Sequence, residues 1–331
     1  MQHPNWQEEL QQTIKDPVAL LERLELRKDK VQLSDKATLS FPVRVPQSFA
    51  DRIKKGDSSD PLLRQVLPVA EEDNIQPGFS VDPLAEQKTQ PIPGLLHKYH
   101  GRALLIVTGA CAIHCRYCFR RHFPYADSNP VKNQWQKALD YLRQDRSIRE
   151  IILSGGDPLT LSDQRLSFLV HKLAEISHIK RLRIHTRMPI VLPDRISNEI
   201  TQWLTGTRLQ PVIVVHANHA NELDNSVTRA IGKLREATIP LLNQSVLLKG
   251  INDSAETLIN LSEALFNIGI IPYYLHMLDP VQGAAHFEVT ETRARQIMIK
   301  LRKKLPGYLV PRLVREYAGS AYKIPVELTV A

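Results

Sequence analysis

The chain has 331 residues, 43% of them hydrophobic, which suffices for one large domain with an appendage or for two domains. It has neither an apolar stretch approaching the ~20 residues of a membrane span nor a basic and apolar leader, so we expect a soluble, cytoplasmic protein without a membrane partner. The net charge of +8 comes from scattered basic runs at 27–30, 180–183 and 300–304 with no aromatic residues between them, which favours solvated faces over a nucleic-acid partner.

Residues 1–95 are predicted to form a helical and irregular appendage. Segments beginning at Trp6 and Val18 have helical spacing of their apolar residues, and Asp60 before Pro61 is typical of a helix N-terminus. Ten of the 22 prolines fall in this segment, which disfavours a long regular sheet. No group that could carry chemistry is evident here.

From residue 103 onward, short apolar runs alternate with segments of helical spacing. The runs cover 103–108, 150–154, 181–186, 211–216, 240–247 and 270–276. After the first interval their starts lie about 30 residues apart, the length of a strand and helix together. The repeats predict an α/β fold of parallel strands with outer helices, in a barrel-like or a doubly wound sheet. Because polar groups follow strand after strand, we favour a partial (β/α)6 barrel over 96–306.

The segments between these runs carry helix signals. Apolar residues from 166 to 176 form one stripe, and Asp253 with Glu256 makes an N-terminal signature for a later helix. Gly269 stands where the C-cap of that helix belongs. A last helix is predicted to end at Pro306, and residues 307–331 form a short C-terminal segment.

All the cysteines of the chain lie in one short stretch, at Cys111, Cys115 and Cys118. Clustered thiols with none elsewhere fit a metal role in a reducing compartment better than a disulfide framework. Three thiolates on one loop can hold three irons of a cubane iron–sulfur cluster and leave the fourth iron open to chemistry. Two alternatives stay open: a zinc site completed by His114 or His122, and three buried thiols on one helix stripe.

The segment Gly155-Gly156-Asp157 follows the second predicted strand. Paired glycines let a backbone approach a ligand closely, and their amides or the Asp157 carboxylate could meet a charged amino acid group. The same motif is also typical of a simple turn that binds no ligand. Its position one strand after the cysteines favours the interpretation as a ligand-binding motif.

Several motifs together resemble those of the lysine 2,3-aminomutases, within the radical S-adenosylmethionine (SAM) superfamily. The cysteine spacing resembles the superfamily's cluster motif, and Gly-Gly-Asp resembles the motif that meets the SAM amino group. The narrower resemblance rests on motifs between about 94 and 325, namely Cys-Arg-Tyr-Cys-Phe-Arg-Arg at 115–121, Leu-Ser-Gly-Gly-Asp-Pro-Leu at 153–159, Asn-Gln-Ser-Val-Leu-Leu at 243–248, Pro-Tyr-Tyr-Leu-His at 272–276 with Asp279, and His-Phe at 286–287. The closest match is the branch that makes β-lysine for modification of elongation factor P.

This resemblance implies an isomerase with three cofactors: a 4Fe-4S cluster, SAM and pyridoxal 5'-phosphate (PLP). In that family the reduced cluster cleaves SAM to a 5'-deoxyadenosyl radical, which acts on lysine joined to PLP. The amino group then moves from the α- to the β-carbon, giving β-lysine. The expected partners are free L-lysine, a reductant protein for the cluster, and, through the product, a ligase and elongation factor P.

The resemblance also implies which residues hold the cofactors. It assigns Lys323 to PLP itself, Lys98 and Arg102 to the PLP phosphate, and His216 and Gln244 to SAM. An amine becomes nucleophilic when burial or a neighbouring cation lowers its pKa, which suits a PLP lysine. The family commonly has a glycine run before this lysine, whereas this chain has Gly-Ser-Ala-Tyr.

Three charged residues match the family's substrate contacts. Arg120 matches the residue that receives the lysine carboxylate, a task that suits a guanidinium fork. Asp279 and Glu316 match two acidic residues that hold the distant amino group, the second of which is usually Asp. Two carboxylates select a dibasic substrate and disfavour glutamate. The alternatives are a radical SAM enzyme that acts on another amino acid or without PLP, and a zinc-stabilised binding protein.

Overall fold

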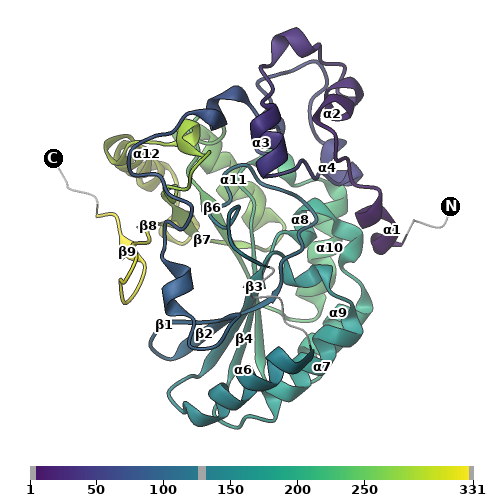
Figure 1. Cartoon of the computed structure of the whole chain (residues 1–331), viewed down its shortest axis with the longest axis vertical. Helices are drawn as coiled ribbons and strands as arrows, with labels where there is room; N and C mark the ends of the chain where they lie inside the picture. Colours follow the sequence, from purple (N-terminus) through teal and green to yellow (C-terminus); the bar gives the residue numbers. More distant parts are fainter. Residues whose placement is uncertain (1–4, 126–131, 328–331) are drawn as a thin grey trace.

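One open sheet of nine strands forms the centre of the computed structural model, which describes residues 5–125 and 132–327 (Figure 1). The strands are β1 (Leu95–Tyr99), β2 (Arg102–Thr108), β3 (Glu150–Gly155), β4 (Arg181–Thr186), β5 (Gln210–Val215), β6 (Leu241–Val246), β7 (Ile271–His276), β8 (Arg312–Arg315) and β9 (Ile324–Pro325). Their order in space is their order in sequence. Strands β2 to β8 pair in parallel, and β1 and β9 pair antiparallel at the two edges.

The predicted α/β fold with a partial barrel is confirmed, and each of the six predicted runs is a strand, β2 to β7. The structure adds a seventh parallel strand, β8, which the sequence did not predict. The only apolar residues of β8 are Leu313 and Val314, which are buried and have an arginine on either side in the sequence. Two apolar residues are too few for a recognisable strand pattern. The strand forms because the edge of β7 offers it main-chain partners.

Helices cover the outer face of the sheet, as the alternation of the sequence predicted (Figure 1). They are α6 (Lys132–Gln144), α7 (Asp163–Ala174), α9 (Asn198–Thr205), α10 (Asn225–Glu236), α11 (Ala255–Asn267) and α12 (Glu291–Lys304), with a single turn of helix at α8 (Met188–Val191). The predicted stripe is the buried face of α7, where Leu166, Leu169 and Leu173 are fully buried. The last helix ends just before Pro306, as expected.

The start of α11 differs from the predicted signature by one residue. Its N-cap is Ser254, whose hydroxyl accepts a hydrogen bond from the Thr257 N–H at 3.1 Å. The Asp253 carboxylate instead accepts from the Gly250 N–H at 2.9 Å and so shapes the preceding turn. Ser and Asp serve equally well as caps, so neighbouring candidates cannot be separated by sequence. Gly269 follows the helix end with φ +86°, as predicted.

The N-terminal segment consists of short helices joined by irregular chain. They are α1 (Trp6–Gln11), α2 (Pro17–Arg23), α3 (Asp35–Ser40), α4 (Gln47–Ala50) and α5 (Pro61–Arg64). Asp60 caps α5 as predicted, accepting from the Leu62 N–H at 2.7 Å. Leu20 and Phe49 are fully buried in the same hydrophobic cluster as Leu182 of β4. The segment therefore shares one core with the barrel.

Short 3-10 turns complete the described structure. They are η1 (Lys28–Lys30), η2 (Ala70–Asp73), η3 (Glu86–Thr89), η4 (Pro158–Thr160), η5 (Pro193–Arg195), η6 (Ala220–Glu222), η7 (Ala285–Phe287) and η8 (Gly307–Leu309). Among the helices within 5–125 and 132–327, none has the length and apolarity to cross a membrane.

Candidate active site

Every residue that the sequence assigned to a cofactor or to the substrate lines one cavity of about 480 Å3. The residues are Lys98, Arg102, Cys111, Cys115, Cys118, Arg120, Gly155, Gly156, Asp157, His216, Gln244, Asp279, Glu316 and Lys323. They come from strands β1, β2, β3 and β6, from the loops after β2, β3, β5 and β7, and from the C-terminal segment. The carboxyl ends of parallel strands meet at one edge of a sheet, which explains how the loop residues gather. Their convergence is a finding, and the role of each stays a prediction.

The N-terminal segment holds the cysteine loop in place. Arg116, between the cysteines, is fully buried and donates to both oxygens of Glu72, at 2.8 and 2.7 Å. The Arg116 N–H also donates to the Gln65 carbonyl at 2.8 Å. A buried arginine paired with a buried glutamate fixes the loop because either charge alone would be costly to bury. No motif marks Glu72 as the partner of Arg116, from which it lies 44 residues away in the chain.

The three thiols suit a site with positive charge. All are free, and burial, with the neighbouring thiols, raises the pKa of Cys118 to about 11 and the pKa of Cys111 well above its usual range. The Cys111 and Cys118 thiols therefore stay protonated unless a cation stabilises their thiolates. The irons of a cluster supply that charge, so the donor set fits a cubane cluster with three cysteine ligands.

The geometry does not favour a zinc site. The part of the chain that the structure describes contains no group of three His, Cys, Asp or Glu side chains placed to hold one metal ion. The His114 Nδ1 lies 2.7 Å from the Pro42 carbonyl oxygen, and the His122 Nε2 lies 3.1 Å from that of Gln282. Each histidine thus uses one ring nitrogen for a main-chain carbonyl and keeps the other nitrogen, so zinc is disfavoured by the absence of a suitable group of ligands among the described residues.

The paired glycines serve the packing of the cysteine loop. A Cβ on Gly155 would lie 2.5 Å from the Thr108 carbonyl oxygen, and a Cβ on Gly156 would overlap the carbonyl of Ala110. Both carbonyls belong to the stretch that leads into Cys111. The glycines are therefore required where two loops of the site touch, besides any approach to a ligand.

The Asp157 carboxylate is largely used within the protein. Its two oxygens accept from the Leu159 N–H and the Thr186 hydroxyl, and from the N–H groups of Arg187 and Met188. These contacts join the loop after β3 to the loop after β4. The Gly156 N–H also has a partner within the protein, because it donates to the Thr108 carbonyl at 2.8 Å. The contact of this motif with SAM stays a prediction.

Changing Gly156 to alanine should damage the cysteine loop. We expect the free energy of unfolding to fall by about 1–3 kcal/mol, because the new Cβ displaces the Ala110 carbonyl in a well-packed site. Less iron should bind after anaerobic reconstitution. Urea denaturation and iron analysis measure the two effects.

Gly232 provides a matched control, because it lies inside α10 with no atom within 4 Å of an added Cβ. Its change to alanine should leave iron binding unchanged and stabilise the helix slightly. Equal iron content in the two variants would contradict the packing role of Gly156.

Charged side chains of alternating sign run along the cavity wall from Arg120 to Lys323. Arg120 donates to both oxygens of Glu86, at 2.6 and 2.8 Å, and Lys98 Nζ lies 3.7 Å from Glu86. The same Lys98 amine lies 3.4 Å from Glu316, whose other oxygen accepts from Lys323 at 2.5 Å. The chain of charges thus links the residues predicted to hold the substrate carboxylate, the phosphate and PLP.

Glu86, in the middle of this chain of charges, was missed by the sequence analysis. It is 5% exposed and belongs to η3 in the N-terminal segment, where the sequence showed no chemistry. Its neighbours are ordinary polar residues of an irregular stretch, so no local signal marks it. Its function follows only from its contacts with Arg120 and Lys98.

Removing the negative charge of Glu86 should lower the stability of the protein. In Glu86→Gln, Arg120 and Lys98 lose a buried counter-charge, and we expect the free energy of unfolding to fall by roughly 3 kcal/mol. Urea denaturation of the ligand-free protein measures it. In the control Glu175→Gln, an exposed pair with Lys172 is lost and the change should stay within about 0.5 kcal/mol. A similar small change in Glu86→Gln would contradict this account.

The two acidic residues predicted to hold the substrate amine have different environments. Although burial alone would raise it, the amines of Lys323 and Lys98 lower the pKa of Glu316 to about 2. Burial and the charge of Glu316 raise the pKa of Asp279 to about 7. Among the described residues, no donor forms a hydrogen bond with the Asp279 carboxylate and no cation forms a direct ion pair with it, although the more distant amines of Lys323 and Lys98 act to lower its pKa.

Two buried histidines also face the cavity without partners. The Nε2 atoms of His185 and His276 make no hydrogen bond within the described residues, and both side chains line the cavity. Burial, reinforced by nearby cations, lowers the pKa of each well below its usual range, so both rings are neutral. Unsatisfied buried nitrogens in a cavity fit a polar ligand such as PLP. The sequence analysis did not single out either residue.

The residues predicted to contact SAM lie at the ends of neighbouring strands. His216 directly follows β5, and its Nε2 lies 3.3 Å from the Tyr117 hydroxyl. Burial, with the charge of Arg187, lowers the pKa of His216 to about 3, so this ring is neutral too. Gln244 lies in β6 and lines the same cavity.

The chain is similar in sequence to known proteins. The sequence model of the radical SAM superfamily matches residues 105–202. The L-lysine 2,3-aminomutase of Escherichia coli (strain K12) is 51% identical over 325 residues, which cover 98% of this chain and 95% of that protein. The L-lysine 2,3-aminomutase of Haemophilus influenzae is 49% identical over 96% of this chain and 94% of that protein. Among solved structures, Streptococcus suis SuiB bound to S-adenosylmethionine aligns with a TM-score of 0.49 and 16% identity, over 70% of this chain and 53% of that one.

Proposed function

Since the chain belongs to the L-lysine 2,3-aminomutase family and has a radical SAM domain at its centre, we propose that it converts L-α-lysine to β-lysine. Members of this family use a 4Fe-4S cluster, SAM and PLP. The observation that carries the substrate assignment is the Asp279 carboxylate, which lines the cavity and has no direct ion-pair partner among the described residues.

The residues of the cavity fit these cofactors. Cys111, Cys115 and Cys118 would hold the cluster, and Lys323 would bind PLP covalently, with Lys98 and Arg102 near its phosphate. When bound, the cluster and SAM supply a radical that takes a hydrogen atom from the substrate, and PLP supplies the carbonyl that holds its amino group. The protein orients these groups and keeps water away from them.

Arg120 has donors left for the substrate carboxylate. Its guanidinium has five N–H groups, of which Glu86 takes two and the Ser154 hydroxyl takes one, at 3.1 Å. Two therefore remain for a carboxylate. The bond to Glu86 keeps the guanidinium plane fixed, so the substrate meets a preformed contact.

The acidic pair supports a dibasic substrate. Asp279 would accept the ε-ammonium of lysine, and Glu316, which lines the same cavity, would be the second carboxylate near it. A neutral or acidic side chain would leave the Asp279 charge buried and unpaired. Glutamate is therefore a poor substrate in this account.

We further propose, from the family resemblance, that the product supplies a ligase that modifies elongation factor P, and that a reductant protein delivers electrons to the cluster. A radical SAM enzyme that acts on another amino acid or works without PLP is the second candidate.

Anaerobic assay of reconstituted protein separates these functions. With dithionite, SAM, PLP and L-lysine we expect β-lysine, and with L-glutamate no β-isomer. Omission of PLP should abolish the product. Protein with full cluster and PLP content that turns over another amino acid but not lysine would overturn the assignment.

A further inference from the structure

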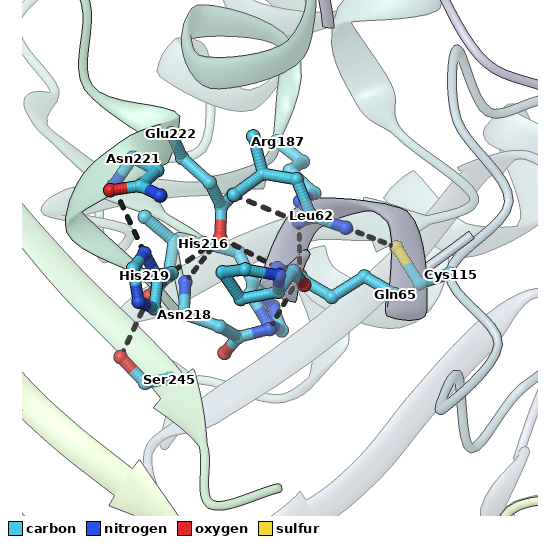
Figure 2. A network of polar contacts seen from close by, with 12 residues as sticks. Leu62, Gln65, Cys115, Arg187, His216, Asn218, His219, Asn221, Glu222 and Ser245 are labelled. Atoms are coloured by element: carbon cyan, nitrogen blue, oxygen red, sulfur yellow. Dashed lines mark hydrogen bonds and ion pairs between the residues drawn. The ribbon is translucent and has the colours of Figure 1, made fainter. Parts of the chain in front are cut away.

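A buried arginine contacts a predicted cluster ligand. Arg187 follows β4, and its Nη1 lies 2.7 Å from the Cys115 Sγ (Figure 2). Its side chain is only 7% exposed. None of the roles assigned above uses this residue, and neither the motifs nor the spacing of the sequence marks it.

The guanidinium is held by a dense set of acceptors (Figure 2). Its Nη2 donates to the Gln65 Oε1 at 2.6 Å and to the Glu222 Oε2 at 2.9 Å. Glu222 is fully buried and accepts from the Asn218 N–H through its other oxygen. The Arg187 main chain donates to Asp157 at 2.6 Å. With Nη2 and the main chain both fixed, Nη1 stays directed at the sulfur.

The Nη1 contact matters because of the charge that reduction adds. Reduction of the oxidised cluster takes one electron from a donor, here dithionite, and transfers no proton, so the cluster and its thiolates gain one negative charge. A hydrogen bond to a ligand sulfur, given by a cation, stabilises that charge. Glu222 offsets part of the arginine charge but contacts the other terminal nitrogen, Nη2.

We propose that Arg187 is a positioning residue that raises the reduction potential of the cluster through the Cys115 sulfur, with Gln65 and Glu222 holding its guanidinium in place. The inference rests on the proposed function, because it requires the cluster that the family carries. It extends that function by giving the N-terminal segment, through Gln65, a part in tuning the cluster.

The test is a potentiometric titration of anaerobically reconstituted protein, monitored by electron paramagnetic resonance, without SAM or lysine. At the potential where half of the native cluster is reduced, we expect Arg187→Met to show at least a tenfold lower ratio of reduced to oxidised cluster. For a one-electron couple this corresponds to a midpoint about 59 mV lower. Arg187→Lys keeps the positive charge but not the planar guanidinium. Its midpoint potential should lie between that of the native protein and that of Arg187→Met.

Arg195 provides a matched control. It is fully buried and pairs with Asp163 at 3.0 Å, but it contacts no cysteine. Arg195→Met should lose stability yet keep the native midpoint. A native midpoint in a fully loaded Arg187→Met protein would overturn the inference, and so would an equal shift in Arg195→Met, because the shift would then report general loosening of the fold.

Two further outcomes are distinguishable. If Arg187→Met fails to hold its cluster, Arg187→Lys decides, and a native midpoint in that variant overturns the inference. The titration contains no lysine, so its result does not depend on the aminomutase activity. If the native protein makes no β-lysine but Arg187→Met still has a lower midpoint, the role of Arg187 is supported and only the proposed function is overturned.

Discussion

Replacement of Lys323 by methionine should abolish covalent PLP binding and lower β-lysine formation at least about 10³-fold, since covalent attachment turns an encounter into an intramolecular contact. The Lys323 amine lies in the cavity, 2.5 Å from Glu316, and its side chain is 23% exposed. Borohydride reduction of the PLP-loaded protein, followed by peptide mapping, should tag Lys323 in the native chain and no residue in the variant.

Lys98 makes this experiment discriminating. It is a second lysine on the same cavity and lies 3.4 Å from the same glutamate. In Lys98→Met the tag should remain on Lys323, while the affinity for PLP falls because a cation near the phosphate is lost. A tag on Lys98 in the native protein would show that the two lysines have been assigned the wrong way round.

Replacement of Asp279 by asparagine should lower kcat/KM for lysine by about 10²–10⁴-fold. Removing one partner of a buried ion pair costs about 3–5 kcal/mol, and each 1.4 kcal/mol corresponds to a factor of ten. Steady-state kinetics with L-lysine measures the loss. As a control, Asp253→Asn changes a carboxylate that serves a turn near α11 and should leave the kinetics as they are. An unchanged kcat/KM in Asp279→Asn would rule out this residue as the ammonium contact.

The pH dependence of lysine binding provides a second readout of Asp279. Its pKa is raised to about 7, mainly by burial, and only the ionised carboxylate attracts an ammonium. The ionised fraction falls from about 0.9 at pH 8 to about 0.1 at pH 6, so kcat/KM should fall about tenfold as the pH decreases. In Asp279→Asn this part of the pH profile should be missing. A native profile that rises toward acid would contradict the sign of the effect.

The strands show why much of the fold could be predicted. Strands such as β2, β3 and β5 have consecutive apolar residues, β4 alternates Leu182 and Ile184 with polar residues, and the helix between β3 and β4 has an apolar stripe of its own. Strand β8 lacks such a run and depends on the edge of β7. The start of α11 was placed one residue early because Asp253 and Ser254 are both good caps.

The ion pairs show why much of the site could not be predicted. Glu86 lies 34 residues before Arg120, and Gln65 lies 122 residues before Arg187. Lys98 and Glu316 are 218 residues apart. No periodicity connects residues at such separations, and a glutamate on an irregular segment resembles many others that only face water.

The sequence by itself determined the class of fold, the cysteine loop and those residues of the cavity that belong to recognisable motifs, because these depend on local apolar patterns and on motifs of neighbouring residues. Only the tertiary structure decided which charges pair: Arg116 with Glu72, Arg120 with Glu86, and Arg187 with Glu222. Those pairings depend on burial and on distances through space. Charge attraction within a core acts between whichever groups the fold brings together, wherever they stand along the chain.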